Sequence, residues 1–177
     1  ELPDGWPTET GLSGEVTQVR DPFTGETIAA IASATVEAVT HAVAQARSYL
    51  PAGPATARAQ VLEHAALLIR DRLEDFARAI AMEAAKPLTQ ARSEVARCVD
   101  TLVYSAIEAR TLAGEMVPME GTEAGAGKLA MVLREPVGVI GAIAPFNFPL
   151  NLVAHKVGPA IAAGCPVLLK PSPQTPL

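Results

Sequence analysis

The sequence contains few aromatic and charged residues, few cysteines and few histidines. Of its 177 residues, 4% are aromatic and 19% are charged, and only two are cysteine and three histidine. A net charge of −5 at pH 7 argues against the basic surface that binds nucleic acids. Since 49% of the residues are hydrophobic, a disordered chain is excluded too. We therefore expect a globular protein with one sizeable core and no nucleic-acid partner.

The scarce cysteines and histidines argue against a disulfide framework and a metal centre. Cys98 and Cys165 form no pairing motif, and the histidines have no metal-ligand spacing. Cys98 falls on an apolar helical stripe, which indicates a core residue far more often than a nucleophile. With no recognisable signal peptide, this cysteine usage leads us to expect a cytoplasmic protein without a bound metal.

Long uninterrupted hydrophobic runs are also absent. The best candidate follows Pro136, but polar residues and several prolines interrupt it. A membrane span needs about 20 predominantly apolar residues, and charges within it are rare. The segment therefore indicates a buried protein core and no membrane partner. The interrupting polar residues are Asn147, Asn151, His155 and Lys156.

Turn-forming residues divide the start of the chain. Residues 1–14 are rich in glycine, proline and threonine, which is typical of an extended arm. The cluster at residues 21–25 separates residues 14–20 from residues 26–32 and predicts a hairpin. Thr35 can then cap a helix that runs to about residue 49. The inward positions of that helix are expected at Val36, Val39, Val43 and Ala46.

Apolar residues recur at helical spacing through the middle of the chain. One stripe predicts two consecutive helices, with Asp71 and Glu74 as a capping box at their junction. Lys86 and Pro87 end this pair, and a third helix is predicted over residues 89–113. The first stripe consists of Leu62, Ala65, Ile69, Leu73, Phe76 and Ile80. The third helix would bury Val95, Cys98, Leu102, Ala106 and Ala109.

A projecting hairpin is predicted over residues 115–135. Gly114 ends the preceding helix. Strand-like segments at residues 116–120 and 128–134 then enclose the glycine-rich residues 121–127. Hairpins of this kind are often oligomer contacts, and we expect that role here.

A strand, a helix and a second strand are predicted next. Two short apolar runs, residues 137–144 and 166–170, lack alternation, as is typical of parallel strands buried on both faces. Asn147 or Phe148 is a candidate cap of the intervening helix. Open α/β sheets bind ligands beyond the carboxyl ends of their strands. Asn147 and Lys170 should therefore meet at one edge of the sheet, where we expect the chemistry.

The helix between these strands has two faces of different character. An apolar stripe should pack on the sheet. A second stripe, which begins beside Asn147, mixes aromatic, polar and aliphatic groups. It would either line a substrate passage or contact a second domain, and the sequence leaves both open. The apolar stripe consists of Leu150, Val153, Ala154, Val157 and Ile161, and the mixed stripe of Phe148, Asn151, Leu152 and His155.

Four segments resemble the aldehyde dehydrogenase superfamily, and the likeness extends over nearly the whole chain. They are DPFTGE, EAAKP (where the family often has ETGKP), GVIGAIAPFNFP and LLKPSPQTP. The last two segments are highly specific at this separation. The resemblance, which includes the branch of lactaldehyde and non-phosphorylating glyceraldehyde-phosphate dehydrogenases, implies oxidation of an aldehyde to a carboxylic acid with NAD or NADP as cofactor.

The resemblance also assigns roles to residues. Asn147 matches the asparagine that holds the oxyanion of a cysteine thiohemiacetal, and it could also be an N-cap. Lys156 matches a lysine with a proton-relay role, with a structural salt bridge as the alternative. Lys170 matches the lysine that hydrogen-bonds the adenosine ribose. The implied cofactor-binding positions are Ile143, Ala144, Pro145, Phe146, Lys170, Ser172 and Pro173, and the implied substrate-binding positions are Phe148, Asn151, Leu152 and His155.

Pro173 stands where many NAD-preferring relatives have a glutamate that binds the ribose hydroxyls. A carboxylate there would repel a 2′-phosphate, so its absence predicts cofactor use relaxed toward NADP. The alternative is that Pro173 only shapes the turn into the next helix.

The family's nucleophilic cysteine and general-base glutamate lie further along its chains than this sequence extends. Cys165 cannot replace that cysteine, because it would lie at the end of the sheet opposite Asn147. We therefore expect residues 1–177 to be the amino-terminal part of an NAD(P)-binding domain, with the catalytic domain absent and no activity of their own. The expected fold is α/β: an N-terminal hairpin and helices lead into the first βαβ unit of a Rossmann-like parallel sheet.

Two alternatives to this function remain open. One is a CoA-acylating aldehyde dehydrogenase, and the other is a short, non-catalytic binding or oligomerisation module. His155 and Asn151 favour a small polar or anionic aldehyde, such as lactaldehyde or a phosphorylated one. The complete protein is expected to be a homodimer or homotetramer.

Overall fold

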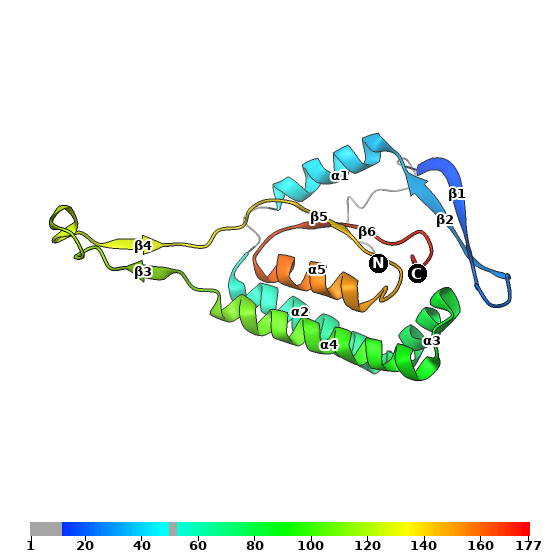
Figure 1. The fold of residues 1–177 in the computed structure, drawn as a ribbon. Coiled ribbons are helices and arrows are strands. Elements are labelled where there is room, and N and C mark those ends of the chain that lie inside the picture. The colour runs from blue at the N-terminus through cyan, green and yellow to red at the C-terminus, as the bar shows by residue number, and fades with distance from the viewer. Residues whose placement is uncertain (1–11, 50–52) are drawn as a thin grey trace.

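The computed structural model describes residues 12–49 and 53–177, so most of the predicted extended arm lies outside the described residues. Two hairpins, five α-helices and a parallel strand pair make up the described fold (Figure 1). In these ranges no helix is both long and apolar enough to cross a bilayer. The elements are β1 (Leu12–Arg20), β2 (Thr27–Ala34), α1 (Val36–Ser48), α2 (Ala55–Asp71), α3 (Leu73–Ala84), α4 (Leu88–Thr111), β3 (Glu115–Val117), η2 (Glu123–Gly125), β4 (Ala130–Val132), β5 (Ile140–Ile143), α5 (Asn151–Ala162) and β6 (Val167–Lys170).

Strands β1 and β2 form the predicted antiparallel hairpin. Asp21 shapes its turn, because Oδ1 accepts hydrogen bonds from the amides of Phe23 (2.8 Å) and Thr24 (3.2 Å). Gly25 has a φ of 77°, a left-handed conformation that glycine adopts without steric cost. The prediction of a turn at residues 21–25 is confirmed.

Helix α1 begins where the sequence predicts. The Thr35 hydroxyl accepts a hydrogen bond from the Ala38 amide at 3.1 Å and so caps the helix. The predicted burial of its valines is wrong for this chain, since Val36 is 78% exposed and Val39 is 49% exposed. No side chain of α1 is buried. The helix contacts β6, but a sheet of two strands is too narrow to cover the whole apolar face.

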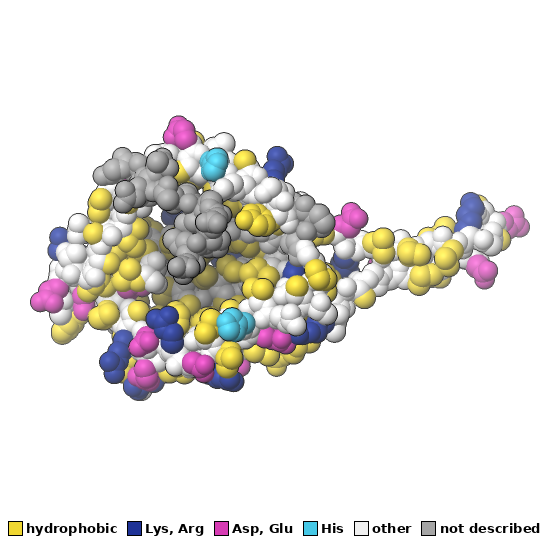
Figure 2. Space-filling model, turned by 180° about the vertical axis from the view of Figure 1, so that it is seen from behind, with side chains coloured by type: hydrophobic (Ala, Val, Ile, Leu, Met, Phe, Trp, Pro, Cys, Tyr) yellow, Lys and Arg dark blue, Asp and Glu magenta, His cyan; other side chains and the backbone are white. Residues whose placement is uncertain are grey.

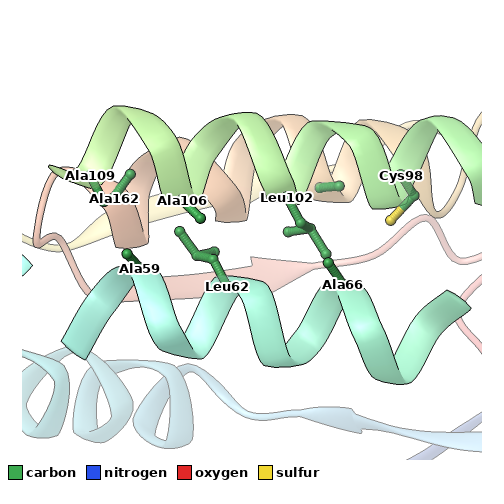
Figure 3. Close-up of a cluster of buried hydrophobic side chains, with 9 residues drawn as sticks. Ala59, Leu62, Ala66, Cys98, Leu102, Ala106, Ala109 and Ala162 are labelled. Carbon is green, nitrogen blue, oxygen red and sulfur yellow. The ribbon is translucent and has the colours of Figure 1, made fainter. Parts of the chain in front are cut away.

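The core lies where α2, α4 and α5 meet (Figure 3). Leu62 of α2 and Leu102 of α4 point toward one another, and alanines fill the positions around them. Small side chains of this kind let helices approach closely. Cys98 is 1% exposed within the cluster, so the prediction of a core cysteine is confirmed. The buried members are Ala59, Leu62, Ala66, Cys98, Leu102, Ala106, Ala109, Ala154 and Ala162.

The junction between α2 and α3 differs from the prediction. Arg72 is the C-cap of α2 and the N-cap of α3, and its side chain makes no capping hydrogen bond. Asp71 is the last residue of α2, so the predicted capping box is wrong. Arg72 alone separates the two helices, and an arginine side chain has no oxygen that could accept a hydrogen bond from the first amides of α3. Glu74 instead accepts two hydrogen bonds from Arg92 of α4, at 2.6 and 3.0 Å, and ties α3 to α4.

The second hairpin projects from the body as predicted (Figure 1). Strands β3 and β4 pair over three residues each, fewer than predicted, and the one-turn helix η2 lies at the tip. Hydrophobic side chains lie along the arm and charged ones gather at its tip (Figure 2). The exposed apolar side chains are Met116, Val117, Leu129, Met131, Val132 and Leu133.

Gly114 has a different role from the predicted one. The C-cap of α4 is Leu112, so Gly114 does not end the helix. A Cβ atom at Gly114 would clash with the backbone carbonyl of Val132. Glycine is needed here because the two strands of the arm approach each other closely at its base.

Strands β5 and β6 form the predicted parallel pair, joined by α5. The helix ends in a Schellman motif: the Gly164 amide bonds to the Ile161 carbonyl (2.9 Å) and the Cys165 amide to the Ala160 carbonyl (2.8 Å). Each strand has only four residues. Burial on both faces is wrong for this chain, since Ile143 is 69% exposed. Alternate residues of a strand face opposite sides, and only one side of β5 is covered.

Helix α5 lies between the two-stranded sheet and the α2–α4 layer (Figure 1). Ala154 belongs to the core cluster, and Leu150 and Ile161 pack against it. The apolar stripe therefore contacts helices as well as the sheet, which corrects the prediction. Gly158 permits close contact with α4, because a Cβ atom there would lie 2.6 Å from the Ser105 Oγ.

Candidate functional site

The carboxyl ends of β5 and β6 lie side by side. Ile143 pairs with Lys170 in the parallel register, and the Ala144 amide donates a hydrogen bond to the Lys170 carbonyl at 3.1 Å. The bend that carries Asn147 leaves β5 at this edge. The backbone thus brings Asn147 and Lys170 to one edge, as the sequence predicts. Cys165 is buried at the other end of β6.

Most of the positions expected to bind a cofactor form an open surface at this edge. Ile143, Pro145, Phe146 and Pro173 are exposed, whereas Ala144 is buried. Lys170 is also exposed, and its ammonium group has only a long contact of 3.5 Å with the Pro171 carbonyl. An exposed apolar surface beside a cation fits a nicotinamide dinucleotide, which combines flat rings with ribose hydroxyls and phosphates. The residues present therefore fit such a cofactor.

Ser172 does not present its hydroxyl to this surface. It is buried, and its Oγ accepts a hydrogen bond from the Gln174 amide at 3.2 Å. Ser172 also pairs with Thr175 in an isolated bridge. The Ser172 hydroxyl therefore shapes the turn that follows β6 and carries the exposed Pro173.

Asn147 lies in an exposed bend between β5 and α5. The N-cap of α5 is Leu150, so the interpretation of Asn147 or Phe148 as its cap is wrong. The first amides of α5 bind Glu94 instead, whose Oε1 accepts hydrogen bonds from Leu150 (3.0 Å) and Asn151 (3.2 Å). The Asn147 side chain forms no hydrogen bond with any described residue. Its amide can therefore bind a ligand.

Lys86, between α3 and α4, contacts the backbone of this bend. Its Nζ donates hydrogen bonds to Glu94 Oε2 at 2.6 Å and to the Asn147 carbonyl at 2.7 Å. Nζ also lies 4.1 Å from the centre of the Phe148 ring. The Glu94 side chain is fully buried and that of Lys86 almost so. Buried ion pairs are tolerated when further hydrogen bonds satisfy both groups, and both groups have such bonds here.

A groove between α4 and α5 opens near Phe148. Arg97 lies 5.7 Å from the centre of the Phe148 ring and also lines the groove. The His155 Nε2 lies 3.5 Å from the Thr101 Oγ1. The cavity has a volume of about 480 Å³. Its polar lining consists of Arg97, Asp100, Thr101, Tyr104, Ser105, Glu108 and His155.

The four residues expected to bind substrate differ in accessibility. His155 and Phe148 are exposed, and Leu152 is half-buried. Asn151 is buried, and its Oδ1 accepts a hydrogen bond from Thr101 at 3.3 Å. Asn151 therefore joins α5 to α4 and does not belong to the open surface of the described chain.

Neither cysteine shows the environment of a reactive group, and the proton-relay role of Lys156 stays a prediction. Lys156 is half-buried and forms no ion pair within the described ranges, so the salt-bridge interpretation finds no partner there. Burial, with a smaller contribution from the Glu94 carboxylate, raises the pKa of the Cys98 thiol to about 12. A thiol with this pKa is not a nucleophile at neutral pH. The described residues include no group of three or more His, Cys, Asp or Glu that could hold a metal.

Sequence reasoning missed Lys86, Glu94, Arg97 and Thr101. Glu94 could have been found, because it falls on the buried stripe of α4 between Ala91 and Cys98. A carboxylate on such a stripe signals a buried charge that needs partners. The other three could not be found, because the contacts that bring them to the site are with α5 and the bend before it, far along the chain.

The sequence profile of the aldehyde dehydrogenase family matches residues 8–177. This chain belongs to that family. Aspartate-semialdehyde dehydrogenase 1 from Pseudomonas canavaninivorans is 47% identical over 163 residues, which cover 90% of this chain and 35% of that protein.

Solved aldehyde dehydrogenase structures share the fold. Aldehyde dehydrogenase 21 from Physcomitrella patens, in complex with the reaction product succinate, has a TM-score of 0.88 at 37% identity, covering 92% of this chain and 34% of that one. A glyceraldehyde-3-phosphate dehydrogenase from Methanocaldococcus jannaschii complexed with NADP has a TM-score of 0.84 at 36% identity, covering 90% and 34%. Similar structures include both NADP complexes and an enzyme described as NAD-dependent. The chain spans about a third of the length of the relatives it matches.

Proposed function

We propose that this chain is the amino-terminal part of an NAD(P)-dependent aldehyde dehydrogenase that oxidises a short anionic aldehyde to a carboxylic acid. The observation that carries the proposal is the convergence of Asn147 and Lys170 at the carboxyl edge of β5 and β6. In this proposal residues 1–177 supply the first strands of a Rossmann-like cofactor-binding domain. The arm of residues 115–135 serves as an oligomer contact.

The residues of this chain have distinct roles in the proposed reaction. A nicotinamide dinucleotide, when bound, supplies the hydride acceptor. Lys170 binds its adenosine ribose, and Ile143 and Phe146 provide an apolar surface for the flat rings. The side-chain amide of Asn147 donates a hydrogen bond to the oxyanion that forms when a thiolate adds to the aldehyde carbon. A neutral donor fixed in advance stabilises this charge as it develops.

The groove between α4 and α5 supports an anionic substrate. Arg97 is a cation in the lining of the groove. It lies close to the Asn147 bend, because it faces the ring of Phe148, the residue after Asn147. The acidic groups Asp100 and Glu108 lie further along α4 and line the same groove. The anionic group of the substrate should therefore bind at the Arg97 end of the groove, where His155 can donate a second hydrogen bond. A relative named for aspartate semialdehyde and a structure with bound succinate fit a substrate of this charge and size.

The experiment compares two four-carbon aldehydes on the longer polypeptide that contains this chain. Succinate semialdehyde has a carboxylate tail and butanal has none. We expect NAD(P)H formation at 340 nm with a higher kcat/KM for succinate semialdehyde. Arg97→Met should lower that kcat/KM by about tenfold and leave the value for butanal nearly unchanged. Arg92→Met is the matched control, since it removes an arginine from the same helix outside the groove.

The outcomes separate the parts of the proposal. No oxidation of either aldehyde with either cofactor contradicts the proposed activity. Equal losses for both aldehydes in Arg97→Met contradict tail recognition only. Release of a thioester when CoA is added shows an acylating enzyme instead.

A further inference from the structure

A buried ion pair lies directly behind the Asn147 bend, although no step of aldehyde oxidation requires charge at that place. We propose that Lys86 and Glu94 are positioning residues, which together fix the backbone of residues 147–151 so that the Asn147 amide meets the developing oxyanion. The inference rests on the proposed function of Asn147 as oxyanion donor.

The pair holds the bend at both of its ends. Lys86 Nζ binds the carbonyl of Asn147 at 2.7 Å, where the bend begins. Glu94 Oε1 binds the amides of Leu150 and Asn151 at 3.0 and 3.2 Å, where the bend becomes helix α5. The 2.6 Å contact between Nζ and Oε2 joins the two anchors into one unit. Any shift of the bend relative to α4 must break at least one of these bonds.

The ion pair of Lys86 and Glu94 is held in place by the packed helices α3 and α4. Glu94 projects from α4 between Ala91 and Val95, which are fully buried. Ala77 and Ile80 of α3 belong to the same buried cluster. Lys86 follows Ala85, whose left-handed φ of 48° turns the chain out of α3. Leu150, at the end of the bend, also packs against this cluster, but the buried members of the cluster all belong to α3 and α4. The anchors are therefore fixed by the packing of α3 against α4.

Asn147 depends on this backbone because its side chain has no anchor of its own. It forms no hydrogen bond with any part of the chain that the structure describes. An oxyanion donor must lie within about 2.7–3.1 Å of the charge that it stabilises. The backbone of Asn147 thus sets where its side-chain amide lies, and Lys86 holds that backbone through the Asn147 carbonyl. Displacement of a catalytic group by about 1 Å can lower the rate about 10²-fold.

The test is a double-mutant cycle in the longer polypeptide, with Lys86→Met, Asn147→Ala and the double variant. Lys86→Met should lower kcat by roughly 10- to 100-fold and change KM for aldehyde and cofactor by less than about threefold. In the Asn147→Ala background, Lys86→Met should cost no further activity, because the group that it positions is gone. Losses that multiply in the double variant would overturn the proposal, as would full kcat in Lys86→Met.

Two variants separate positioning from general loss of structure. Arg92→Met removes an ion pair that also joins α3 to α4, through Glu74, but that makes no contact with the bend. We expect it to keep wild-type kcat. Lys86→Met with Glu94→Gln leaves no unpaired buried charge and retains an oxygen for the α5 amides, so it provides a folded variant if Lys86→Met fails to fold. It should show the same loss of kcat, and normal activity of this variant would overturn the proposal.

Amide hydrogen exchange measures how firmly the bend is held, independently of enzymatic activity. The peptide that covers residues 147–152 should exchange at least about tenfold faster in Lys86→Met than in wild type, whereas Arg92→Met should leave it unchanged. Unchanged exchange in Lys86→Met overturns the positioning role. If the wild type oxidises no aldehyde, the proposed function fails and the catalytic half of this inference fails with it. Exchange then still decides whether Lys86 and Glu94 hold the bend.

Discussion

Single residues at the site are held in different ways, and this difference decides what each can do. Asn151 is fixed by burial and by Thr101, whereas Asn147 has an exposed side chain on a bend whose backbone is fixed. A side chain that is already satisfied contributes to structure, and one that is not remains available to a ligand. We therefore expect substitutions of Asn147 to affect rate more than stability.

Asn147→Ala tests this expectation in the longer polypeptide. The variant should lower kcat by about 10²–10³-fold, because it removes one oxyanion donor. The melting temperature should change little, since Leu150 is the N-cap of α5 and no described residue depends on the Asn147 amide. Steady-state kinetics and thermal unfolding measure the two effects. Full turnover with a lowered melting temperature would show that Asn147 is structural only.

Pro173→Glu tests the cofactor preference. Pro173 is exposed on the turn after β6, close in sequence to the exposed Lys170. A carboxylate there would repel a 2′-phosphate, so Pro173→Glu should lower kcat/KM with NADP at least about tenfold relative to NAD. The wild type should use both cofactors. Rejection of NADP by the wild type, or an unchanged ratio in the variant, contradicts the prediction.

The location of a site residue can be predicted from the sequence where the pattern of its own segment is sufficient. Asn147 and Lys170 could be placed at one edge, because Asn147 comes shortly after one short apolar run and Lys170 closes the other. Lys86 could not be assigned, because its contact with the Asn147 carbonyl joins residues that are 61 positions apart. Glu94 gave a local sign of burial but no sign of the amides that it binds. The anchors of the site thus depend on tertiary packing that no local pattern specifies.

For helices and strands too, features set by neighbouring residues could be predicted, and features set by tertiary contacts could not. The turn at Asp21 and the cap at Thr35 use hydrogen bonds to the next few residues, so they could be predicted. The junction at Arg72 could not, because the neighbouring helices decide where each one ends. The burial of Val36 and Ile143 was overestimated, since a single element does not show how much of it a partner covers.

Gly114→Ala tests the close approach at the base of the arm. A Cβ atom at Gly114 would clash with the Val132 backbone, which cannot rotate away as a side chain can. The variant should lower the free energy of unfolding by about 1–3 kcal/mol, in the range for overpacked sites, and disturb the pairing of β3 with β4. Gly121→Ala, at the tip of the same arm, is the control, because nothing lies within 4 Å of its Cβ position. Equal stability of the two variants in denaturant unfolding would contradict the prediction.

The described residues expose apolar side chains in several places, and two of these are parts of strands. One is the arm with Met116 and Met131, and the other is the uncovered face of β5 around Ile143. Unpaired strand edges and apolar faces promote association. The 177-residue chain on its own should therefore self-associate.

The isolated 177-residue chain should also oxidise no aldehyde. It contains two thiols, and neither suits the chemistry. Cys98 is buried with a pKa of about 12, so at pH 8 only about 10⁻⁴ of it would be thiolate. Cys165 is buried at the end of β6 opposite the Asn147 bend. Absorbance at 340 nm with either cofactor and succinate semialdehyde should stay at background, while light scattering reports a mass above that of a monomer. NAD(P)H formation by the pure chain that disappears in Cys98→Ser or Cys165→Ser would show that one of these buried thiols is the nucleophile after all.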